Sequence, residues 1–65
     1  MRSRYDSELD ALYIRFAEAP VSESEEIRPG IVLDFDADGK VVAIEMLDAS
    51  RHLAPGANLK ELEAA

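Results

Sequence analysis

Short apolar segments with a period of two residues, separated by turn residues, constrain the fold of this chain more than any other feature. Such alternation is typical of half-buried β-strands, whereas helices show a period near 3.6 residues. Pro29-Gly30 and Asp38-Gly39 are turn-forming pairs between apolar segments. The alternating segments are residues 2–5, 12–16, 21–27, 31–35 and 41–47. The pattern predicts an α+β, mainly β fold: an antiparallel β-meander of four to five short strands.

The last part of the chain carries helix signals. Asp48 or Ser50 can cap a short helix through residues 51–53, which a following Pro-Gly pair ends. Asn58 can cap a further helical turn, in which two leucines three residues apart share a face. We therefore expect one β-meander domain with a short helix in residues 1–54. Residues 55–65 form a C-terminal tail, for which two alternatives stay open: a docked helical turn, or a frayed end held only by a neighbouring chain.

The segment 41–47 is apolar on both of its faces. A strand of this kind needs cover on both sides, and a 65-residue chain has little left to cover the second. The chain has no cysteine, so disulfides cannot supply the missing stability. The sequence therefore predicts a homo-oligomer, a dimer or higher. The candidate interface residues combine the outward side of this strand with a neighbouring tyrosine and arginine: Tyr13, Arg15, Val41, Ala43 and Leu47.

The charge balance excludes several classes of partner. Fourteen acidic residues against seven basic ones leave a net charge of -7, and the basic residues are scattered. Nucleic-acid affinity depends on neutralising phosphates with Lys and Arg, so we expect no nucleic-acid partner. The longest strictly apolar run has four residues, far short of a membrane span or the core of a signal peptide. We expect a cytoplasmic protein.

One motif match concerns calcium. Asp34, Asp36, Asp38, Gly39 and Glu45 have the spacing of an EF-hand loop, which surrounds a calcium ion with oxygen ligands. A true EF-hand needs a helix on each side, whereas the flanking segments alternate like strands. The strand-like flanking segments therefore predict that these acidic residues form the turn of a β-hairpin. Weak calcium binding by Asp34, Asp36 and Asp38 remains the alternative.

Other polar clusters have simpler interpretations than catalysis. His52 is the single histidine, and with Asp48 and Ser50 it could be written as a base beside a nucleophile. Helix capping explains the same three residues. The acidic residues of segments 6–10 and 23–26 are interpreted as solvated charge, and the mostly polar segment 21–27 predicts an edge strand. We expect no enzyme, no cofactor and no catalytic residues.

Several blocks together carry a family resemblance. They are Tyr5-Asp6, residues 10–15 (DALYIR), residues 29–36 (PGIVLDFD), Gly39 and residues 44–50 (IEMLDAS). In order and spacing this pattern resembles the bacterial family called domain of unknown function 2283, although the tail after Ala54 is not family-like. The resemblance implies a small cytoplasmic β-meander with a C-terminal helix, in which the acidic turn is a hairpin, and no assigned catalytic residues. It also implies that members occur beside genes for small toxins. A second functional hypothesis is therefore an acidic antitoxin-like partner that neutralises a small basic toxin encoded nearby.

Overall fold

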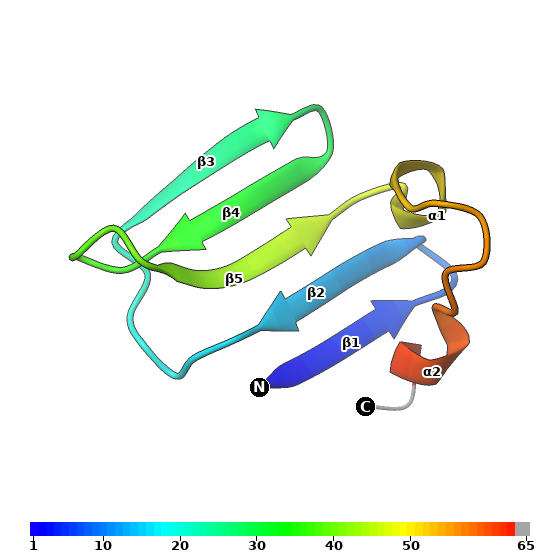
Figure 1. Ribbon diagram of the computed structural model, residues 1–65, viewed down its shortest axis with the longest axis horizontal. Helices are drawn as coiled ribbons and strands as arrows, with labels where there is room; N and C mark the ends of the chain where they lie inside the picture. The colour runs from blue at the N-terminus through cyan, green and yellow to red at the C-terminus, as the bar shows by residue number, and fades with distance from the viewer. Residues whose placement is uncertain (64–65) are drawn as a thin grey trace.

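A computed structural model describes residues 1–63 of the protein as one five-stranded antiparallel sheet with two short helices. The predicted fold class, mainly β with antiparallel strands and short helices, is confirmed (Figure 1). The strands are β1 (Arg2–Asp6), β2 (Ala11–Arg15), β3 (Glu23–Arg28), β4 (Ile31–Phe35) and β5 (Val41–Met46). The helices are α1 (Ala49–His52) and α2 (Lys60–Glu63).

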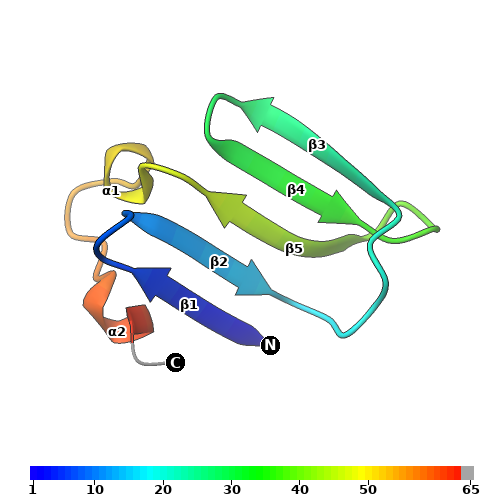
Figure 2. The ribbon, with the colours of Figure 1, turned by 180° about the vertical axis from the view of Figure 1, so that it is seen from behind.

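The strand order differs from an uninterrupted meander in one connection. The order across the sheet is β1-β2-β5-β4-β3, so β2 pairs with β5 and not with β3. Residues 16–22 carry the chain past the ends of β5 and β4 to the far edge, where β3 begins (Figures 1 and 2). The sequence signal for an edge strand is confirmed, because β3 lies at an edge and all six of its residues are exposed.

The predicted turns form where the turn residues stand. Gly30 and Gly39 both have positive φ, 89° and 79°, which glycine adopts without a steric penalty. The turn between β1 and β2 is closed by Asp6, whose Oδ1 accepts hydrogen bonds from the backbone N–H groups of Glu8 (3.0 Å) and Leu9 (3.3 Å). Local turn chemistry therefore fixes three hairpins of the sheet.

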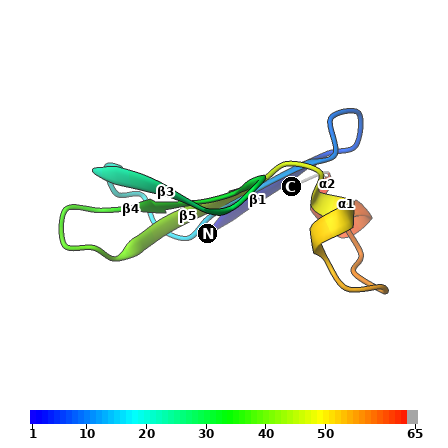
Figure 3. The same ribbon diagram turned by 90° about the horizontal axis from the view of Figure 1, so that it is seen from above.

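The core lies under one end of the sheet. Both helices pack on the same side of the sheet at this end, while the turn between β1 and β2 rises on the other side (Figure 3). Leu59 and Leu62 pack there, partly buried. The buried residues of this cluster are Leu12, Ile31, Met46 and Ala49, and the partly buried residues packed against them are Tyr5, Ile14, Ile44, Leu53, Leu59 and Leu62.

Candidate functional site

The sheet has two chemically different faces, which the strand register assigns. Residues directly opposite each other on paired strands point to the same side of a sheet, and neighbours along a strand point to opposite sides. The helix-bearing face carries Tyr5, Leu12, Ile14, Phe16, Glu23, Glu25, Ile31, Leu33, Phe35, Ile44 and Met46. The opposite face carries Arg2, Arg4, Tyr13, Arg15, Ser24, Glu26, Val32, Asp34, Ala43 and Glu45.

Much of the helix-bearing face extends beyond the helices. Each helix has only four residues, and both lie at one end of the sheet (Figure 3). At the other end of the sheet, Phe16 is 47% exposed. Val42 is fully buried there, in the part of β5 that lies between Phe16 and the bulge at Phe35. We call this region the open apolar half. It consists of Phe16 and four half-buried side chains: Ile14, Leu33, Phe35 and Ile44.

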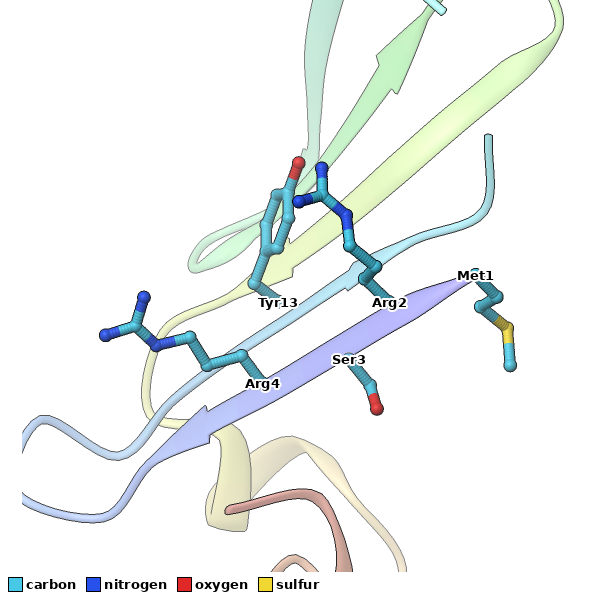
Figure 4. Close-up of a pocket in the computed structure, with 5 residues that line it drawn as sticks. All are labelled: Met1, Arg2, Ser3, Arg4 and Tyr13. Carbon is cyan, nitrogen blue, oxygen red and sulfur yellow. The ribbon is translucent and has the colours of Figure 1, made fainter. Parts of the chain in front are cut away.

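The opposite face carries charge that is divided across the sheet. Its cationic side is formed by β1 and β2, where Arg2 and Arg4 stand on either side of the Tyr13 ring (Figure 4). Arg15 donates from Nη1 to the Tyr13 hydroxyl (3.2 Å) and from Nη2 to the carbonyl oxygen of Ala19 (2.7 Å). The hydrogen bond to Tyr13 raises the pKa of Arg15. The arginine is therefore held against its own chain as a permanent cation.

The anionic side of the same face is formed by β4 and β5. Asp34 is buried and accepts a hydrogen bond of 2.6 Å from the Ser24 hydroxyl. Burial, and then the negative charge of Asp34, raise the pKa of Glu45. Ala43 lies between Arg15 and Asp34 in the register and is fully buried. Asp34 therefore has a hydrogen-bond partner within the chain, on the neighbouring strand β3.

Four of the predicted interface residues lie on the opposite face or beside its groove: Tyr13, Arg15, Ala43 and Leu47. Tyr13 and Arg15 lie on the opposite face, and Ala43 is already buried by its own chain, so another chain cannot reach it. Leu47 follows the end of β5 and is 61% exposed, whereas Val41 stands at its start, past the bulge, and is 43% exposed.

A hydrogen-bonded junction joins α1 to the turn between β1 and β2. The Asp10 carboxylate accepts hydrogen bonds from the Tyr5 hydroxyl (2.6 Å), the Ser50 hydroxyl (2.6 Å) and the Ser50 backbone N–H (3.1 Å). The Asp10 carbonyl oxygen accepts a bond of 2.9 Å from the backbone N–H of Ala49. The hydrogen bond from the Ser50 side chain, followed by that from Tyr5, lowers the pKa of Asp10. The junction therefore favours the carboxylate form.

This junction corrects the predicted helix cap. Asp48 occupies the N-cap position with a left-handed φ of 52°, but its side chain makes no capping hydrogen bond. Ser50 lies inside α1 and donates to Asp10 rather than capping the helix itself. The cap comes from Asp10, forty residues earlier. The sequence signal that could have found it is the presence of an aspartate at the start of block 10–15 and a serine at the end of block 44–50 of the family pattern.

Comparison with known proteins assigns the family. The family model described as Protein of unknown function (DUF2283) matches residues 2–50, which are 49 of the 65 residues. The chain belongs to the DUF2283 family. The match spans all five strands and reaches Ser50, so it includes every member of the Asp10 junction. No curated protein and no solved structure matches the chain.

His52 in this DUF2283 chain lies against the turn between β3 and β4. A Cβ atom built on Gly30 would lie 2.9 Å from Nε2 of His52 and 3.1 Å from the backbone oxygen of Leu47. The hydroxyl of Ser50 donates to Asp10. The Ser50 hydroxyl is therefore directed at Asp10, and His52 packs against the end of the sheet.

The acidic hairpin of the DUF2283 chain does not gather its carboxylates. Asp34 points to Ser24 on the opposite face, and Asp36 Oδ1 accepts hydrogen bonds from the backbone N–H groups of Asp38 and Lys40, both at 2.9 Å. Within residues 1–63, no group of three or more acidic or histidine side chains is placed to hold a metal ion. The hydrogen bonds of Asp36 instead shape the turn between β4 and β5.

No helix in the part of the chain that the structure describes has the length and apolar character needed to cross a membrane.

Proposed function

We propose that this DUF2283 domain is a non-enzymatic interaction domain that works as a homo-oligomer. One observation carries the proposal. The chain exposes 4764 Å² of surface, whereas a compact monomer of its mass, 7.2 kDa, exposes about 4,100 Å². The excess is about 650 Å², close to the roughly 800 Å² that each partner contributes to an interface of standard size. A second copy can remove surface of this order from water.

The small core supports the same proposal. The buried hydrophobic residues in the described part of the chain are Leu12, Ile31, Val42, Ala43, Met46 and Ala49. Two of these six are alanines, and Val42 is the largest side chain that is wholly buried. Small domains with few buried side chains are marginally stable, and association stabilises the folded form by mass action.

The non-enzymatic part of the proposal rests on what the polar clusters do. Asp10 anchors α1 through Ser50, and Asp36 closes the hairpin between β4 and β5. Asp34 is bound by Ser24, and Arg15 by Tyr13 and Ala19. Each of these groups has a structural partner that accounts for its position. We place this role in the cytoplasm, where a chain without cysteine needs no oxidising environment.

Sedimentation equilibrium of the unmodified protein tests the proposal. Across about 1 to 100 μM protein we expect the mean mass to rise to at least twice 7.2 kDa and the midpoint of thermal unfolding to rise with it. A folded monomer at the highest concentration, with a midpoint independent of concentration, would contradict self-association.

The edge strand β3 favours a second candidate function, the acidic antitoxin-like partner. Glu23, Glu25 and Glu26 are exposed on a strand with an unpaired edge. A basic protein could add a strand to this edge and neutralise these carboxylates. Co-expression with the product of the neighbouring gene tests this function. A basic protein should co-purify, and Glu26→Lys should weaken its retention more than Glu8→Lys, which reverses an exposed charge elsewhere. Equal retention by both variants would contradict binding at β3.

A further inference from the structure

We infer that the second copy docks on the open apolar half of the helix-bearing face and not on the opposite face. This inference rests on the proposed self-association and identifies the surface responsible for it. The two faces make different demands on a partner, because the open half of one is apolar and the other carries charged side chains on each of its strands.

The open apolar half is a continuous surface. Ile14, Ile44 and Leu33 are direct cross-strand neighbours on β2, β5 and β4. Phe16 extends this row toward the end of the sheet through its backbone hydrogen bond to Val42 (2.8 Å), and Phe35 stands beside it on β4. A contiguous exposed apolar area of this kind marks an interaction surface on a soluble protein. Here it is unbroken by charge until the edge strand β3.

A partner on the opposite face would have to remove charged side chains from water. The shallow groove on that side is lined mainly by apolar residues, Leu9 and Leu47 among them, but the charged Arg4 and Glu45 also line it. Removing such charges from water costs several kcal/mol per ion unless each finds a well-placed partner. Arg15 and Asp34 already have their contacts, and Ala43 offers no exposed surface.

The helices define how two copies can meet. They protrude from one end of the helix-bearing face, so a flat partner cannot cover the whole face (Figure 3). A second copy related by a two-fold axis can bring its open apolar half against the first, with the two pairs of helices at the outer ends. The sheets would then pack about 10 Å apart, as in sandwiches of two sheets. Such an assembly ends at two copies, because each copy presents the same surface to the other and no further copy can add to it.

Charge at the rim predicts the response to salt. Glu23 and Glu25 lie on β3 beside Phe35 and Leu33, on the helix-bearing face, and both copies carry them. Repulsion between these carboxylates opposes pairing, and salt screens it, so association should strengthen as salt increases. Pairing through the opposite face would bring Arg2 and Arg4 against Asp34 and Glu45, and salt would weaken it.

The test compares two exposed apolar residues, each replaced by the same charged residue. Phe16→Glu places a carboxylate in the open apolar half, and Leu47→Glu places one beside the groove of the opposite face. We expect Phe16→Glu to weaken dimerisation by about 30-fold or more, the effect of losing one central anchor residue. We expect Leu47→Glu to change the dissociation constant by less than about threefold. Far-UV circular dichroism verifies that both variants fold.

Two further measurements test the docking surface if Phe16→Glu does not fold. The unmodified protein should associate more tightly at high salt, and Glu25→Lys, at an exposed position, should tighten association by removing repulsion at the rim. An unmodified dimer that is dissociated by Leu47→Glu but not by Phe16→Glu, or that weakens with salt, would overturn the inference and leave self-association intact. A monomeric unmodified protein would overturn both.

Discussion

Replacing Gly30 with alanine tests whether the turn between β3 and β4 is closed by close packing or only by its backbone conformation. A Cβ atom at Gly30 would meet His52 Nε2 at 2.9 Å and the Leu47 carbonyl oxygen at 3.1 Å. Gly39 is the matched control, because its φ of 79° is also positive but a Cβ atom there would meet no heavy atom within 4 Å. The difference between the two variants isolates the contacts.

The expected costs follow from these geometries. A left-handed backbone costs an L-residue about 1–2 kcal/mol, which both variants share. Overpacking at a tight site adds about 1–3 kcal/mol, which only Gly30→Ala incurs. We therefore expect losses in the free energy of unfolding of about 2–5 kcal/mol for Gly30→Ala and about 1–2 kcal/mol for Gly39→Ala. Gly30→Ala should cost less in a protein that already carries His52→Ala, because the shortest contact is then gone.

Urea unfolding followed by far-UV circular dichroism measures these losses. Every variant is compared at the same protein concentration, because association contributes to the apparent stability. Equal losses for Gly30→Ala and Gly39→Ala, within about 0.5 kcal/mol, would refute close packing at Gly30. An unchanged cost of Gly30→Ala after removal of the His52 ring would refute it as well.

Three further predictions concern single polar or buried positions. Asp10→Asn should lower the melting temperature. The lowered pKa of Asp10 stabilises the fold above the ordinary value of 3.8, and this contribution is lost as the pH falls through the lowered pKa. Thermal melts from pH 2 to 7 should therefore show a weaker pH dependence for the variant in that window, and parallel curves would contradict it. Ala43→Leu should cost about 1–3 kcal/mol in urea unfolding, because Arg15 and Asp34 enclose the site, and an unchanged midpoint would show that the site is open. Glu45→Gln should raise the stability at pH 7, because the raised pKa reflects a disfavoured carboxylate, and the gain should vanish below pH 4.5. A loss of stability at pH 7 would contradict it.

The strands and turns could be predicted because their signals are local. Alternation places Leu12 and Ile14 on one side of β2 wherever β2 lies in the sheet. Gly30 and Gly39 predict turns because glycine adopts a positive φ without a steric penalty. The pairing of β2 with β5 has no such signal. The same alternation suits any neighbouring strand, so the Greek-key connection through residues 16–22 depends on the whole sheet.

The cap of α1 and the position of the exposed apolar surface could not be predicted from the sequence. Both depend on contacts between segments that are far apart in the chain. Asp48 and Ser50 look like local caps, but Asp10 caps the helix across a sequence separation that composition cannot reveal. The sequence also predicts that the outward side of segment 41–47 lacks cover. Ala43 is covered by Arg15 and Asp34 from the two neighbouring strands, and the helices are too short to cover Phe16. Phe16 therefore adds an uncovered apolar side chain on the other face, while Val41 and Leu47 of the segment remain exposed.

Sedimentation equilibrium of the unmodified protein, repeated at low and high salt, tests the proposed self-association most directly. We predict a mass of at least twice 7.2 kDa that persists to lower protein concentration as salt increases. A folded 7.2 kDa monomer at about 100 μM in both salts would contradict it.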